Sequence, residues 1–290
     1  MTLLKPHLDV TALTQLWSGL NHPEDLVWDS HRRVIYAGGE HGELYRGSLT
    51  GEWAKVAECG ESACLLGLAL DEKGNVYACD IGNSRVIQIN PDDFSVVVIS
   101  TGCAERPMVS PNYPAFDPNG RLFVSDSGAW GQDEGVIYVI DSLQGTSVWS
   151  SAVSDFPNGI AFSSDNSHLY VVESHSSSVW RVEVDGAGGA GQATRVWNEP
   201  LTVPDGIAFD IDGRLYVACY TPCTIYMVEP DLRSGQILAH DWTAQLMRAP
   251  TNLAFLGDDL ALLGSANFNG HHLNIMTPPS PGLVIQRPPF

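Results

Sequence analysis

The sequence predicts an all-β protein, a six-bladed β-propeller with four antiparallel strands in each blade. A hairpin pattern recurs at equivalent positions 24, 66, 112, 158, 205 and 251. The period is about 45 residues, which is typical of propeller blades built from short alternating strands. Long stretches of 3.6-residue periodicity, which repeats made of helix pairs would need, are absent.

Each repeat contains an apolar strand, a turn of Gly, Asn or Asp, and a second apolar strand. The clearest copy runs over 203–220, where Asp205 stands just before the first strand and Asp212-Gly213 forms the turn. The predicted second strands are 34–37, 76–79, 122–125, 169–172, 215–218 and 260–263.

The last repeat is short of a fourth strand before a proline-rich tail, whereas 13–17 is a spare strand ahead of the first repeat. We therefore expect the amino-terminal strand to complete the last blade and remove an open sheet edge. On this interpretation, residues 1–290 form a single propeller domain.

Composition limits the possible partners and the location. The 34 acidic and 15 basic residues give a formal net charge of -19, which would repel nucleic acids and anionic membranes. No apolar run is long enough to span a bilayer. The opening residues do not resemble a signal peptide, so we expect a cytoplasmic protein whose six cysteines are free thiols.

One rim of the propeller is predicted to collect the polar side chains. Because strands alternate in direction, the starts of the first strands and the ends of the second strands share this rim. Four equivalent positions there hold Glu24, Asn112, Asn158 and Asp205. Two carboxylates and two amide oxygens suit Ca²⁺, with Mg²⁺, Mn²⁺ and Zn²⁺ as alternatives. The alternative role for these residues is to cap the strand starts.

Further rim residues are candidates for substrate contact. They are Asn112, Tyr113, Glu40, His41, Asp126, His175 and Tyr220. The two histidines could supply a second base or a donor to substrate, and ordinary polar surface is the alternative. The opposite rim, which carries the Asp-Gly turns, looks generic.

Several repeats carry a short motif around the polar position: Pro23-Glu24 with Trp28-Asp29, Pro111-Asn112 with Asp117, Pro157-Asn158-Gly159, and Pro204-Asp205-Gly206. These motifs resemble the family of senescence marker protein (regucalcin), gluconolactonase and luciferin-regenerating enzyme. The resemblance implies a six-bladed propeller with a divalent cation at its centre. It also implies that Glu24, Asn158 and Asp205 are metal ligands, and that Asn112 lies at the metal or contacts substrate.

The chain departs from this family at three places. Glu24-Asp25-Leu26 replaces a common Glu-Gly-Pro, and Asn112-Tyr113 replaces an Asn-Asp pair. Ser110 stands where some relatives have an arginine that helps to hold sugar lactones, and this weakens the case for gluconolactone itself. Arg106 lies nearby in sequence and is a candidate replacement.

We therefore expect a Ca²⁺-dependent lactonase that hydrolyses a sugar lactone or a related small lactone, with Asp205 as the base that accepts the proton of the attacking water. Two alternatives remain: an aryl esterase or phosphotriesterase that uses the same metal, and a non-enzymatic binding propeller. No Gly-x-Ser-x-Gly nucleophile elbow is present.

Overall fold

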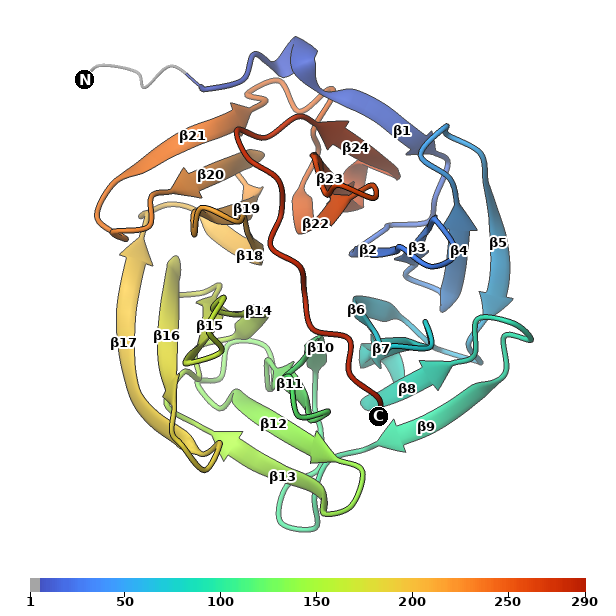
Figure 1. Cartoon of the computed structure of the whole chain (residues 1–290), viewed down its shortest axis with the longest axis vertical. Coiled ribbons are helices and arrows are strands. Elements are labelled where there is room, and N and C mark those ends of the chain that lie inside the picture. The colour runs from blue at the N-terminus through green and yellow to red at the C-terminus, as the bar shows by residue number, and fades with distance from the viewer. Residues whose placement is uncertain (1–5) are drawn as a thin grey trace.

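Six four-stranded antiparallel sheets surround a central axis in the computed structural model, which describes residues 6–290 (Figure 1). The prediction of a six-bladed propeller is therefore confirmed. Residues 1–5, on which the expectation about a signal peptide partly rests, lie outside the described residues.

Each blade runs from an innermost strand at the axis to an outermost strand at the perimeter (Figure 1). The innermost strands are β2 (Leu26–Asp29), β6 (Leu65–Leu70), β10 (Pro111–Phe116), β14 (Pro157–Phe162), β18 (Val203–Phe209) and β22 (Pro250–Leu256). The second strands are β3 (Val34–Gly38), β7 (Val76–Asp80), β11 (Leu122–Asp126), β15 (His168–Glu173), β19 (Leu215–Thr221) and β23 (Leu262–Asn267). The third strands are β4 (Glu43–Gly47), β8 (Arg85–Ile89), β12 (Val136–Asp141), β16 (Ser178–Val184), β20 (Thr224–Val228) and β24 (His272–Met276). The outermost strands are β5 (Trp53–Glu58), β9 (Val96–Ser100), β13 (Gly145–Ser150), β17 (Ala190–Asn198), β21 (Gly235–His240) and β1 (Thr14–Ser18).

The amino-terminal strand closes the ring, as predicted. In the sixth blade the strand order is β1-β24-β23-β22, and β1 pairs antiparallel with β24. The first and last segments of the chain thus share one sheet, which leaves no blade short of a strand.

The predicted starts of the second strands and of the amino-terminal strand agree with the structure to within one residue, except in the sixth blade. The second strand of the sixth blade begins at Leu262 rather than Leu260. Leu260 has a φ of 53°, and its amide donates to the carbonyl oxygen of Gly257 (3.1 Å), so it belongs to the turn. The apolar run from Leu260 onward conceals this turn in the sequence.

Apolar side chains between neighbouring blades form the core. Between the first two blades, for example, buried Tyr36 and Leu44 belong to one cluster with Leu68 and Val76. The helical segments are short 3-10 turns, η1 (Val10–Ala12), η2 (Ile81–Asn83) and η3 (Phe268–Gly270). Within residues 6–290, no helix is of the length and apolarity that a membrane span requires. All six cysteines are free.

After β24, the carboxyl-terminal tail crosses the face of the propeller that carries the turns between first and second strands (Figure 1). The amide of Leu283 donates to the carbonyl of Phe209 (2.9 Å), and that of Glu72 donates to the carbonyl of Pro288 (3.2 Å). The tail therefore connects opposite sides of the ring. This rim, which looked generic in the sequence, is covered by the chain's own terminus.

Candidate metal centre

Irregular strand starts position three of the four candidate ligands. The β-ladder shifts register between Pro111 and Tyr113, and again after Pro157 and Pro204 in the next two blades. A bulge of this kind directs a side chain away from the ladder. Asp205 consequently lies inside β18, not before it as the sequence suggested.

The candidate ligands are buried, and three of them carry an oxygen without a partner. Glu24 is 7% exposed, and Asn112, Asn158 and Asp205 are 3%, 4% and 6% exposed. The Oδ1 atoms of the latter three accept no hydrogen bond from any described residue. Leaving a buried oxygen unpaired costs about 1–3 kcal/mol, so three at equivalent positions point to a missing electropositive partner.

Serine side chains fix the orientation of both asparagines. Asn112 Nδ2 donates to Ser127 Oγ (3.1 Å), whose hydroxyl donates to the carbonyl of Pro157 in the next blade (2.7 Å). The same arrangement recurs one blade further on, where Asn158 Nδ2 donates to Ser174 Oγ (3.3 Å). Because each amide nitrogen is held by its serine, each amide oxygen is left available to a ligand.

The two carboxylates interact although they come from the first and fifth blades. Burial raises the pKa of Glu24 well above its usual value, and the charge of Asp205 raises it further. Burial also raises the pKa of Asp205 to about 7, although a hydrogen bond from Asn158 acts in the opposite direction. A divalent cation between them would offset both the burial and the repulsion.

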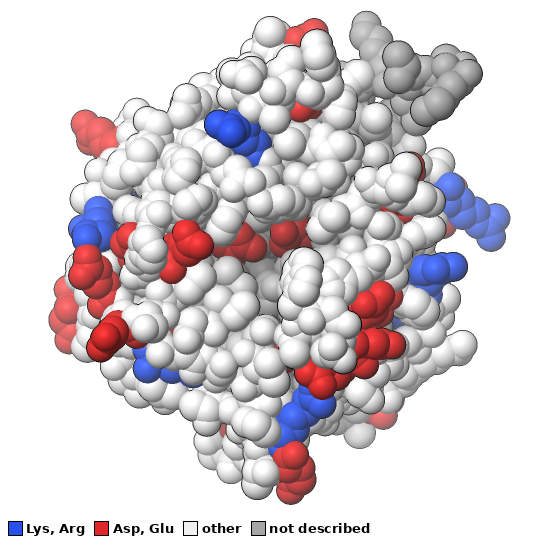
Figure 2. Space-filling view, turned by 180° about the vertical axis from the view of Figure 1, so that it is seen from behind, with Lys and Arg blue, Asp and Glu red and all other residues white. Residues whose placement is uncertain are grey.

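The donor set fits a hard cation. Figure 2 shows acidic side chains beside a central hollow on the face opposite the tail. In the part of the chain that the structure describes, no group of three or more His, Cys, Asp or Glu side chains is placed to hold a metal. The asparagine oxygens are therefore needed, and a mixture of carboxylate and amide oxygens suits Ca²⁺ better than a softer ion.

Two further buried side chains follow equivalent positions 24 and 251 directly, and they were not predicted as site residues from the sequence. Asp25 and Asn252 are both 0% exposed. Asp25 Oδ2 accepts from the amide of Leu68 (2.7 Å), and Asn252 Nδ2 donates to the carbonyl of Glu24 (3.1 Å). Each has an Oδ1 atom without a partner in the described chain. Comparing the repeats at the next position would have revealed both residues.

The rim residues Glu40 and His41 are paired within the protein. A carboxylate oxygen of Glu40 lies 2.6 Å from His22 Nδ1, and Asn21 Nδ2 donates to His41 Nδ1 (2.7 Å). A substrate that binds to either residue would have to share it with this partner.

The remaining candidates for substrate contact occupy different depths. Tyr220 lies near the rim, where Asn269 Nδ2 donates to its hydroxyl (2.7 Å). Asp126 is 0% exposed, and its oxygens accept three backbone N–H groups, which is a structural role. Tyr113 lines a cavity on the far side of the ligand positions rather than the rim.

His175 belongs to an aromatic cluster with Trp130 and Phe156. Trp130 is 77% exposed and packs edge-on against Phe156 and His175, with ring centroids 5.1 and 4.8 Å apart. His175 also lies 3.2 Å from a carboxylate oxygen of Asp155. Phe156 has a φ of 65°, and its backbone turns immediately before β14. The cluster forms an apolar wall at the rim.

Comparison with known proteins supports the resemblance drawn from the motifs. The model of the SMP-30/Gluconolactonase/LRE-like region matches residues 22–263. Regucalcin from Bos taurus is 27% identical over 177 residues, 57% of each chain. Gluconolactonase from Zymomonas mobilis is 26% identical over 184 residues, which are 57% of this chain and 51% of that enzyme. The matches thus span just over half of these relatives. The structure of regucalcin from Agrobacterium tumefaciens, described as a calcium-binding protein, has a TM-score of 0.75 at 16% identity and covers 93% of both chains.

Proposed function

The chain belongs to the SMP-30/Gluconolactonase/LRE-like family, and from this membership and the buried side-chain oxygens of the four candidate ligands we propose that it is a Ca²⁺-dependent lactone hydrolase. The observation that carries the proposal is the set of unpartnered oxygens on Asn112, Asn158 and Asp205. They occupy equivalent positions in three consecutive blades, and the carboxylate of Glu24 interacts with that of Asp205.

In this proposal Glu24, Asn112, Asn158 and Asp205 hold the cation. A bound divalent cation supplies Lewis-acid polarisation of the lactone carbonyl and stabilises negative charge on its oxygen. The serines behind the two asparagines keep the amide oxygens in place. The regucalcin of Agrobacterium tumefaciens, which is described as a calcium-binding protein, favours Ca²⁺ over Mg²⁺, Mn²⁺ and Zn²⁺.

Asp205 acts as the general base. As a water oxygen adds to the carbonyl carbon, Asp205 accepts a proton from that water. The ring C–O bond then breaks, its electron pair stays on the ring oxygen, and a proton returns to that oxygen. The product is an open-chain hydroxy acid. His41, His175 and Tyr220 at the rim are the proposed contacts for the rest of the substrate, and a small lactone is the proposed partner.

A second candidate is hydrolysis of aryl esters or aryl phosphotriesters by the same centre. The exposed Trp130, packed on Phe156 and His175, favours it, because an aromatic wall can hold a flat leaving group. We also expect a cytoplasmic location, since six free thiols are typical of a reducing compartment.

A substrate panel tests these proposals. The chelated chain is assayed with sugar lactones, alkyl lactones, aryl acetates and an aryl phosphotriester, before and after each divalent ion is restored. Faster turnover of lactones than of aryl substrates with Ca²⁺ supports the first proposal, and the reverse order supports the second. If no substrate turns over with any ion, both are wrong and the chain is a binding propeller.

A further inference from the structure

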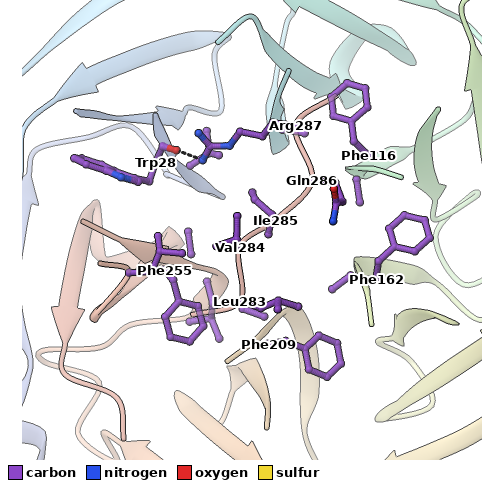
Figure 3. Close-up of a pocket in the computed structure, with 18 of the residues that line it drawn as sticks. Trp28, Phe116, Phe162, Phe209, Phe255, Leu283, Val284, Ile285, Gln286 and Arg287 are labelled. Atoms are coloured by element: carbon purple, nitrogen blue, oxygen red, sulfur yellow. Dashed lines mark hydrogen bonds between the residues drawn. The ribbon is translucent and has the colours of Figure 1, made fainter. Parts of the chain in front are cut away.

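The cavity that Tyr113 lines lies in the central channel, on the tail side of the propeller and away from the candidate metal centre (Figure 3). We call it the chamber. Its volume is about 370 Å³, and its walls come from the innermost strands of all six blades together with tail residues 283–287. This volume is within the range of small-molecule sites in proteins.

A ring of small side chains creates this space. Positions 24, 66, 112, 158, 205 and 251 are equivalent in the six blades. Three residues after this position, five blades carry alanine and the first blade carries Val27. All of these residues line the chamber: Ala69, Ala115, Ala161, Ala208 and Ala254. The next position is aromatic in five blades, which makes the outer part of the wall apolar: Trp28, Phe116, Phe162, Phe209 and Phe255.

The chamber is separated from the candidate metal centre by one closely packed layer of residues. Within this layer, a Cβ atom on Gly206 would come within 2.1 Å of Asn252 Oδ1, and one on Gly67 within 2.6 Å of Tyr113. Even a methyl group would not fit between these neighbouring blades. A molecule in the chamber would therefore not occupy the cation site.

The tail closes the chamber as a strap that is held at its two ends. At one end, Gly282 and Leu283 donate backbone hydrogen bonds to the carbonyls of Leu260 and Phe209, both 2.9 Å. At the other end, the ring of Phe290 packs against that of Tyr77, with centroids 5.1 Å apart. Between these anchors, 284–286 make no backbone hydrogen bond to any other described residue. This middle section can move aside without breaking backbone pairing.

A guanidinium group stands at the edge of the chamber without a carboxylate partner. Arg287 is the one Arg or Lys among the lining residues, and it is half-buried. It donates to the carbonyl of Trp28 and to Ser30 Oγ (3.4 Å), and none of the ion pairs among the described residues includes it. Burial lowers the pKa of Arg287, and the charge of Asp29 offsets this only in part, because Asp29 is itself paired with Arg32 (3.2 Å). Asp258, the acidic residue of the lining, is already paired with Arg33 (2.8 Å). A partly desolvated cation favours an anionic ligand.

We propose that the chamber is a binding site for an apolar carboxylate, with its hydrocarbon part among the alanines and its carboxylate on Arg287. The site is separate from the candidate metal centre, and it does not depend on the proposed hydrolytic function. The ligand enters beside the middle section of the strap, where Val284 and Ile285 are 72% and 54% exposed.

Titration calorimetry with decanoate tests the proposal. The full chain is first treated with a chelator, so that no bound cation can attract the carboxylate. We expect saturable binding of one decanoate per chain. Affinity should rise about fourfold for each methylene, or about 15-fold from octanoate to decanoate, because each buried CH₂ group contributes equally until the chamber is full. Absence of saturable binding, or binding that appears only after Ca²⁺ is restored, overturns the proposal.

Substitutions locate the ligand. Ala208→Leu and Ala115→Leu place bulk in the chamber from different blades, and each should weaken decanoate binding at least about tenfold. Ala54→Leu, on the exposed outermost strand β5, is the matched control and should leave binding unchanged. Equal binding by all three variants, each checked for an unchanged thermal transition, contradicts the assignment to the chamber.

The role of Arg287 has its own test. Arg287→Gln retains a donor for the carbonyl of Trp28 but removes the charge. We expect it to bind decanoate about tenfold more weakly and to bind decanol as the parent chain does. Asp205→Asn should bind decanoate normally, because it alters only the candidate metal centre. If Arg287→Gln keeps the full preference for decanoate over decanol, the carboxylate does not lie on Arg287 and the proposal is wrong.

Discussion

Replacing Ser174 with alanine should remove the hydrogen bond that orients the candidate ligand Asn158. The Ser174 hydroxyl accepts from Asn158 Nδ2 (3.3 Å) and donates to the carbonyl of Pro204 (2.7 Å). Without it, a buried amide nitrogen and a buried carbonyl both lose a partner. At about 1–3 kcal/mol for each unpaired group, partly relieved by reorientation, the free energy of unfolding should fall by about 2–4 kcal/mol.

The effect on cation binding follows from the same two contacts. Asn158 would keep only its hydrogen bond to Asp205, so its amide oxygen would be held less firmly toward the cation. Removing a partner of a metal ligand typically weakens affinity 10–100-fold. That loss corresponds to about 1.4–2.8 kcal/mol. Competition between the protein and a fluorescent Ca²⁺ chelator measures it directly.

Ser100→Ala is the matched control for this experiment. Ser100 is 7% exposed, and its hydroxyl bonds to the hydroxyl of Thr146 (2.7 Å) on the outer strands, far from the axis. This variant should lose stability without losing Ca²⁺ affinity. If the two variants lose the same stability and both keep full affinity, the serine does not orient Asn158 for a cation.

Three further predictions concern the ring and the loops. Asp205→Asn should raise the free energy of unfolding of the chelated chain by about 1 kcal/mol or more, because it removes a buried charge beside Glu24. Ca²⁺ should no longer stabilise this variant. Thermal melts with chelator or Ca²⁺ measure both effects, and a lower transition temperature for the chelated variant than for the chelated parent chain would count against the buried repulsion. Gly206→Ala should destabilise the fold strongly, because its Cβ would lie 2.1 Å from Asn252 Oδ1. Urea unfolding should show that the free energy of unfolding falls by about 2 kcal/mol or more. A near-neutral result would contradict the close packing between the candidate metal centre and the chamber. Asp241 tests pH dependence: burial raises its pKa, but hydrogen bonds from Thr243 and nearby backbone amides dominate and lower it to about 2. Since the folded pKa lies below the unfolded value of 3.8, the stabilisation exists above about pH 4 and is lost as the pH falls toward 2. The gap in urea midpoint between the parent chain and Asp241→Asn should therefore be present at about pH 6 and close in acid, and a constant gap would show that the charge of Asp241 is not its cause.

The sequence was sufficient for the fold because every blade repeats one local pattern. The short period and the turns between apolar strands predict the blades individually, and the spare amino-terminal strand predicts their closure. Leu260 shows the limit of this approach, because an apolar residue in a turn cannot be told from the start of a strand by hydrophobicity.

The candidate ligand positions could also be predicted from the repeat, but the serines that orient the two asparagines could not. Ser127 and Ser174 act on side chains of another strand and on carbonyls of another blade, so no local pattern links them to the asparagines. Asp25 and Asn252 stand one residue beyond positions 24 and 251, outside the polar set that the repeat aligns.

The chamber shows a different limit. Its alanines are visible in the sequence at equivalent positions of five repeats. Small residues at a blade's inner edge are also consistent with tight packing around the axis. Only the path of the tail over the channel and the position of Arg287 reveal an enclosed space with a charged edge.

The stoichiometry of Ca²⁺ binding is the most direct test of the candidate metal centre. Calorimetric titration of the chelated full chain should show one Ca²⁺ per chain, and both Asp205→Asn and Glu24→Gln should weaken that binding at least about 100-fold. Ca²⁺ binding that survives unchanged in both variants, or no binding by the parent chain, would contradict a cation centre formed by Glu24, Asn112, Asn158 and Asp205.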